Sequence, residues 1–190
     1  MIILNIFIFD KKNIMMKKYF ITYLLFMSSL MLTGQSFYDL KIEGINGDTI
    51  YFNDFKGKYV LVVNVASKCG YTKQYADLEK LNQKYDNLII LGVPCNQFAN
   101  QEPKNEKEIL QFCTETYNVS FPMTSKVNVK GKAQHDVYQW LTKKTQNKVD
   151  DFRISWNFNK FLISPKGNLI KHFGSSIKPF NKSINSLIKL

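Results

Sequence analysis

A buried strand that leads through a cysteine-containing turn into a helix is the feature that most constrains this chain. The apolar run at 60–63 predicts a strand over 59–65, and a helical spacing of apolar side chains predicts a helix over roughly 71–84. Cys69 lies between them, where the free backbone N–H groups of a helix start favour an anion. Because the thiolate is the nucleophilic form of cysteine, Cys69 is the candidate reactive residue. The alternative is a small buried cysteine that only packs.

The rest of the chain predicts an α/β fold with a mixed central sheet flanked by helices. Turn residues such as Asn46-Gly47 indicate an N-terminal β-hairpin, and Asn105 with Glu108 forms a capping-box pattern at a helix start. The expected elements are strands 37–42, 49–52, 59–65, 88–93, 160–163 and 168–173, and helices 71–84, 105–118, 136–144 and 179–190. This order, with a reactive cysteine where the first core strand meets a helix, is the thioredoxin-like arrangement.

The N-terminus has the pattern of a secretory signal. A basic start at 16–18 is followed by an apolar stretch at 19–32 and small residues at 33–36. The apolar stretch is short for a membrane span. We therefore expect residues 1–35 to be a signal peptide or N-terminal extension and 36–190 a single domain that is exported to the periplasm or secreted. An uncleaved membrane anchor is the alternative.

The charge and the histidines limit the possible partners. The net charge is +11, but the lysines are scattered and no nucleic-acid motif is present. We expect no nucleic-acid partner and, at most, a peripheral contact with a membrane. His135 and His172 lie far apart, without the paired ligands of a metal site. No metal and no cofactor are therefore expected.

The three cysteines, Cys69, Cys95 and Cys113, form no C-x-x-C pair, which argues against an ordinary disulfide oxidoreductase. Two further segments could serve Cys69. The polar loop at 94–103 leaves the end of a neighbouring buried strand, the edge where α/β sheets bind ligands. Trp156-Asn157 offers an indole and an amide donor, which can stabilise a sulfur anion. An ordinary polar loop and a core tryptophan beside a turn asparagine are the alternatives.

Several blocks of this sequence, over about residues 37–190, resemble the glutathione peroxidase family. In order they are NVASKCGYT, PCNQFANQEP, NEKEILQFC, FP and WNFNKFLISPKG. The resemblance implies a thioredoxin-like fold and a peroxidase that reduces hydrogen peroxide and organic or lipid hydroperoxides. It implies that Cys69 is the peroxidatic residue, supported by Gln101, Trp156 and Asn157. Two positions depart from the family pattern: Ala99 stands where glycine is usual, and His172 lies near a usual arginine.

The chain resembles the monomeric branch of that family, because the long insertion of the tetrameric, glutathione-using members is absent. This implies a reductant of the thioredoxin type or glutathione, a sulfenic acid on Cys69, and a redox-active disulfide formed when Cys113 attacks it. Cys95 matches a cysteine generally considered dispensable. A peroxide sensor or relay that oxidises partner proteins is the alternative. A non-catalytic basic binding module is a third hypothesis.

Overall fold

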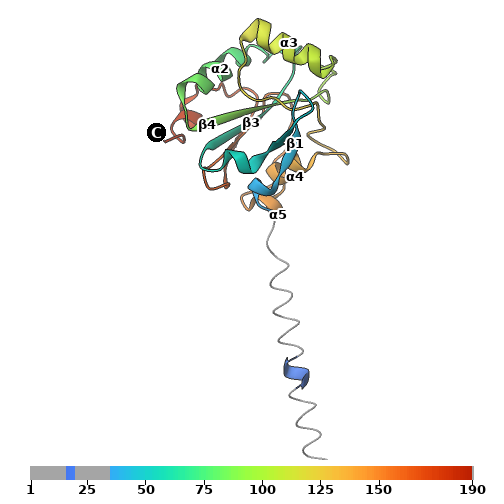
Figure 1. Ribbon diagram of the computed structural model, residues 1–190, viewed down its shortest axis with the longest axis vertical. Helices are drawn as coiled ribbons and strands as arrows, with labels where there is room; N and C mark the ends of the chain where they lie inside the picture. Colours follow the sequence, from blue (N-terminus) through green and yellow to red (C-terminus); the bar gives the residue numbers. More distant parts are fainter. Residues whose placement is uncertain (1–15, 20–34, 190) are drawn as a thin grey trace, which may run out of the picture. The chain divides into compact units, whose positions relative to one another are not determined.

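Residues 35–189 are built on a four-stranded mixed sheet (Figure 1). The computed structural model describes residues 16–19 and 35–189. Strand β3 (Tyr59–Val65) is central and parallel to β4 (Leu88–Pro94). On its other side it pairs antiparallel with β5 (Lys160–Ile163), which pairs antiparallel with β6 (Leu169–Phe173). The order β4-β3-β5-β6 confirms the predicted mixed sheet.

The other elements surround this sheet. They are η1 (Phe37–Asp39), β1 (Lys41–Glu43), β2 (Thr49–Tyr51), η2 (Phe52–Phe55), α2 (Gln74–Lys84), α3 (Glu106–Tyr117), α4 (Asp136–Thr142), α5 (Lys144–Asn147) and α6 (Lys182–Asn185). Strands β1 and β2 form the predicted antiparallel hairpin. In Figure 1, α2 and α3 lie on one side of the sheet and α4 and α5 on the other.

Strand β3 is buried on both faces, which explains its unbroken apolar run. Its side chains at 61, 63 and 65 pack in one apolar cluster with residues of α2, α3 and α6. Those at 60 and 62 pack in a second cluster with residues of η1, η2 and α4. The sheet is therefore covered on both faces, and β3 anchors the turn that carries Cys69.

Three predicted helix boundaries are wrong. Helix α2 begins at Gln74 rather than near 71, because the Thr72 hydroxyl accepts a hydrogen bond from Cys69 N–H and donates one to Ala66 O, which folds the preceding residues into turns. The predicted helix 136–144 divides into α4 and α5 at Lys143, whose backbone is extended.

The last helix is only one turn long rather than spanning 179–190. The side-chain amide of Asn185 donates hydrogen bonds to the backbone carbonyls of Pro179 and Asn181. Local bonds of this kind compete with the propagation of a helix. The predicted strand at 37–42 also shortens, because its first residues form η1, which Ser36 caps.

The N-terminal segment is described only in small part. The chain divides into two compact units, 1–34 and 35–190, and residues 16–19 form a helical turn in the first. The predicted signal segment 1–35 otherwise lies outside the described residues, apart from Gln35, and it stays a prediction. Within the described ranges, no helix combines the length and the hydropathy that a membrane span requires.

Candidate active site

Cys69 sits in a tight turn between β3 and α2, with 8% of its surface exposed. Its backbone N–H donates to Thr72 Oγ1 at 3.0 Å, and its carbonyl accepts from Thr72 N–H at 3.0 Å. The N–H of Tyr71 points at the sulfur, with N to Sγ at 3.4 Å. This backbone donor points at Sγ in place of the helix start that the sequence predicted.

The loop after β4 is attached directly to this turn. Lys68 N–H donates to Gln101 O at 3.0 Å. Ser67 donates to the Glu102 carboxylate through its N–H, at 2.8 Å, and through its hydroxyl, at 2.9 Å. Burial raises the pKa of Glu102, against the opposing effects of Ser67 and nearby lysines. The fully buried Glu102 therefore locks the two loops together at the carboxyl ends of β3 and β4.

Gln101 and Asn157 meet across the site. Asn157 Nδ2 donates to Gln101 Oε1 at 3.1 Å, and Asn157 Oδ1 is buried without a hydrogen-bond partner among the described residues. In the described part of the chain the hydrogen bond to Cys69 Sγ comes from Tyr71 N–H, and none comes from Gln101, Trp156 or Asn157. The three side chains thus lie on segments that the fold gathers, with their bonds to sulfur unmade in this structure.

Trp156 borders an open hollow next to the cysteine turn. The hollow has a volume of about 490 Å³ and is lined by Tyr71, Ser155, Trp156, Gly174, Ser175 and Ser176. Trp156 is 37% exposed, and its ring lies 5.8 Å from that of Phe98. Tyr71, which lines this hollow, also donates its backbone N–H to Cys69 Sγ, so the hollow adjoins the cysteine turn.

A buried polar corner fixes the Trp156-Asn157 segment. Asn64, on β3, donates to Trp156 O at 3.0 Å and accepts from Asn159 N–H at 2.9 Å. Phe158 between them has φ of 62°, a left-handed conformation that costs a bulky side chain about 1–2 kcal/mol. Lys160 Nζ donates to Phe158 O at 2.7 Å. Burial lowers the pKa of Lys160 to about 7.

Cys113 lies in α3, and its side chain belongs to the apolar cluster that α2 and α3 form with the sheet. It is fully buried, and burial raises its pKa to about 11. The neighbouring Tyr75 hydroxyl opposes that increase in the pKa of Cys113. Cys69 and Cys113 belong to the same apolar cluster, and all three cysteines are free.

Cys95 and the histidines stand apart from this chemistry. Cys95 is buried in the other apolar cluster, and burial raises its pKa. His135 caps α4 by accepting from Val137 N–H, and His172 bonds to Asn159 Oδ1 at 2.8 Å. Across residues 16–19 and 35–189, no group of three or more His, Cys, Asp or Glu side chains could hold a metal ion.

The sequence reasoning missed the residues that support the site. Glu102 and Lys160 are charged side chains at full burial, and Asn64 is a polar side chain inside β3. Asn64 interrupts an otherwise apolar strand, and this was the available signal. The burial of Glu102 and Lys160 depends on tertiary packing, which their local sequence does not reveal.

Ala99, which departs from the family pattern, has a measurable cost. Its φ is 52°, in the left-handed region that glycine adopts without strain, and its side chain is exposed. We expect Ala99→Gly to raise the free energy of unfolding by about 1 kcal/mol. Urea denaturation measures the change. Ala133→Gly, at an exposed position of negative φ, is the control and is expected to give no gain.

The comparisons with known proteins agree with this geometry. The sequence model described as glutathione peroxidase matches residues 37–142. The chain belongs to the glutathione peroxidase family. A glutathione peroxidase-like peroxiredoxin of Schizosaccharomyces pombe is 50% identical over 145 residues, covering 75% of this chain and 91% of that protein. A glutathione peroxidase of Lactococcus lactis subsp. cremoris is 46% identical, covering 76% and 92%.

Solved structures give the same family and fold. The apo crystal structure of Trgpx superposes with a TM-score of 0.63 at 37% identity, covering 81% of this chain and 93% of that one. A secreted Mycobacterium tuberculosis disulfide oxidoreductase shares the fold alone, with a TM-score of 0.51 at 10% identity, covering 79% and 93%. The thioredoxin-like fold predicted from the sequence is confirmed. This glutathione peroxidase family member is an oxidoreductase of the peroxidase type.

Proposed function

We propose that the protein is a thiol peroxidase in which Cys69 reduces hydrogen peroxide and organic or lipid hydroperoxides. The observation that carries this proposal is the cysteine turn itself. Cys69 Sγ receives the N–H of Tyr71 beside an open hollow, where the loops after β3 and β4 and the Trp156-Asn157 segment converge. The relatives' names favour this peroxidase over the sensor or relay alternative.

The first step oxidises the sulfur. The Cys69 thiolate attacks one oxygen of the peroxide, so that an S–O bond forms as the O–O bond breaks. The departing oxygen leaves as an alkoxide or hydroxide and takes a proton to become an alcohol or water. We assign Gln101, Trp156 and Asn157 to donate hydrogen bonds to the thiolate and the departing oxygen. Catalytic hydrogen bonds are often long in unliganded sites and shorten when the substrate binds, and we expect the same of these donors.

The second step forms a disulfide. The Cys113 thiolate attacks the sulfenic sulfur of Cys69, an S–S bond forms, and the hydroxyl leaves as water after taking a proton. A dithiol of the thioredoxin type, or glutathione, then reduces the disulfide by exchange. Because Cys113 is fully buried in α3, the end of that helix has to open first.

A comparison of reductants tests the function. We expect residues 36–190 to consume hydrogen peroxide steadily with thioredoxin, thioredoxin reductase and NADPH, and at least about tenfold more slowly with glutathione, because none of the residues that line the hollow beside Trp156 is basic and could bind the carboxylates of glutathione. Oxidation of NADPH measures the turnover. Cys69→Ser is the blank. Peroxide consumption that survives in Cys69→Ser would refute the assignment.

We further propose that the protein acts as a monomer outside the cytoplasm, after removal of residues 1–35, with its basic surface in peripheral contact with the membrane. The support is the basic, apolar and small-residue order of the N-terminus and the net charge of +8 that remains when residues 1–35 are removed, from 22 basic and 14 acidic residues. Fractionation with N-terminal sequencing tests the export and the cleavage site. Sedimentation tests the oligomeric state, and salt extraction tests the membrane contact.

A further inference from the structure

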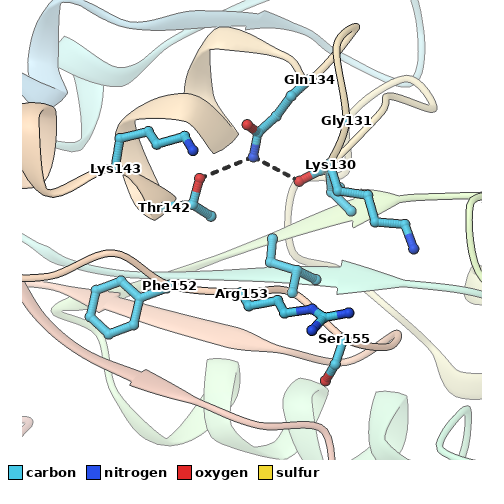
Figure 2. Close-up of a pocket in the computed structure, with 10 residues that line it drawn as sticks. Lys130, Gly131, Gln134, Thr142, Lys143, Phe152, Arg153 and Ser155 are labelled. Carbon is cyan, nitrogen blue, oxygen red and sulfur yellow. Dashed lines mark hydrogen bonds between the residues drawn. The ribbon is translucent and has the colours of Figure 1, made fainter.

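A second cavity lies between the loop that precedes α4 and the segment that precedes Trp156 (Figure 2). Its volume is about 270 Å³. None of the lining residues is acidic, and three are cationic. They are Val129, Lys130, Gly131, Gln134, Thr142, Lys143, Phe152, Arg153, Ile154 and Ser155. Nothing in the peroxidase chemistry described above uses this cavity.

The cations come from three different segments. Lys130 lies in the loop before α4, Lys143 follows α4, and Arg153 lies on the strand-like segment opposite (Figure 2). Among the described residues none of the three forms an ion pair with a carboxylate. A hollow lined by one sign of charge focuses the potential and raises the local concentration of counter-ions. The three exposed cationic residues that line the cavity therefore lack a carboxylate partner among the described residues, and a bound anion would offset their charge.

One side of the cavity, its floor, is formed by Gln134 and Thr142 and is already held in place by hydrogen bonds. Gln134 Nε2 donates to Val129 O at 2.9 Å and to Thr142 Oγ1 at 3.0 Å, as the dashed lines of Figure 2 show. Thr142 is buried, and its hydroxyl donates to Tyr138 O at 2.6 Å. Because these bonds fix the loop to α4, binding requires little reorganisation of the floor.

The cavity touches the reactive site at two points. Ser155 lines both this cavity and the hollow beside Trp156. Lys130 Nζ lies 4.3 Å from the centre of the Phe98 ring, and that ring lies 5.8 Å from the ring of Trp156. An anion that draws Lys130 into the cavity would take its charge off Phe98 and alter the contact of Phe98 with Trp156.

We propose that this cavity binds a small polyanion, a molecule with two or more carboxylate or phosphate groups, separately from the peroxide, and that Trp156 senses its binding. Three cations on separate segments fit several anionic groups at once better than a single one. The cavity contacts the Trp156 segment through Ser155 and through Phe98. On the proposed peroxidase function, this contact makes the cavity an effector site. The ligand chemistry is shared by small carboxylates and phosphates, and the probes below separate them.

Titration of the full chain with citrate and with pyrophosphate, at constant ionic strength, tests this inference. Calorimetry is expected to show saturable binding of one molecule per chain for at least one probe. Lys143→Gln and Arg153→Gln are each expected to weaken it about tenfold, since each removes a charged contact. Lys144→Gln, which removes an exposed lysine that does not line the cavity, is the control and is expected to change binding less than twofold.

Acrylamide quenching of tryptophan fluorescence tests the coupling, because Trp156 is exposed whereas Trp140 is buried. The bound probe is expected to change the quenchable fraction in the native chain and not in Lys130→Gln. Absence of saturable binding, or equal weakening by Lys144→Gln, would overturn the site. Binding without any change at Trp156 would overturn its role as an effector. Both readouts are independent of peroxide turnover, so they stand even if the peroxidase assignment fails.

Discussion

Cys113→Ser is expected to stop turnover with a protein dithiol while leaving one stoichiometric reaction with peroxide. The peroxidatic step does not involve Cys113, which forms no hydrogen bond with the Cys69 turn among the described residues. Without a second thiol, the sulfenic acid accumulates instead of closing to a disulfide. Measurement of peroxide consumed per mole of protein should give about one equivalent, and dimedone should trap the sulfenic acid.

Two matched variants complete this experiment. Cys69→Ser is expected to consume no peroxide and to bind no dimedone, whereas Cys95→Ser is expected to turn over at nearly the native rate. Normal turnover of Cys113→Ser with thioredoxin would show that another group resolves Cys69. Glutathione is unsuitable as the donor here, because a small thiol can reduce the sulfenic acid directly and conceal the loss.

In the proposed mechanism, we expect the buried position of Cys113 to limit the rate at which it attacks the sulfenic acid of Cys69. Its burial raises its pKa to about 11, so the thiol is neutral until α3 opens. The end of α3 is held by Asn118, whose N–H bonds to the carbonyls of Cys113 and Thr114 in a left-handed cap. The residues of α3 before this cap include weak helix formers. We therefore expect the last turn of α3 to open locally, without unfolding of the whole domain.

The fold features that local chemistry determines are those that the sequence predicts well. The capping box of Asn105 with Glu108 marks the start of α3 and is present as predicted. The predicted strands 160–163 and 168–173 are present as β5 and β6, which pair antiparallel. The start of α2 was misplaced because the Thr72 hydroxyl bonds inside the preceding turn, a choice that the apolar periodicity of the helix does not encode.

The candidate site was predictable as far as it depends on strand ends. Cys69 and Gln101 follow the parallel neighbours β3 and β4, whose carboxyl ends meet at one edge of the sheet. The hydrogen bond from Asn157 to Gln101 requires the left-handed turn at Phe158, a backbone conformation that phenylalanine does not favour. That turn is maintained by Asn64 and Lys160, and their role emerges only when β5 is placed beside β3.

The buried Lys160 is expected to make the free energy of unfolding rise with pH, an effect that an exposed lysine does not produce. Its folded pKa, about 7, lies below the model-compound value of 10.5, because burial disfavours the charged amine. Between these two values the unfolded chain binds more protons than the folded chain. The contribution of Lys160 to the free energy of unfolding therefore rises with pH across that window and is lost as the pH falls towards 7.

Lys160→Met isolates this effect. The native protein is expected to gain about 2 kcal/mol of unfolding free energy relative to Lys160→Met between about pH 7 and about pH 9. Urea denaturation of both proteins at several pH values measures the difference. His172, whose pKa is lowered by burial and by Lys160, titrates below this window.

Lys171→Met, on the same hairpin but exposed, is the control and is expected to run parallel to the native curve. A native curve that stays parallel to that of Lys160→Met would mean that the amine is charged in the folded state, with a counter-charge or water beside it. In that case the corner at Phe158 would be held by an ammonium rather than by a neutral amine. The pH profile thus distinguishes which form of Lys160 supports the Trp156-Asn157 segment.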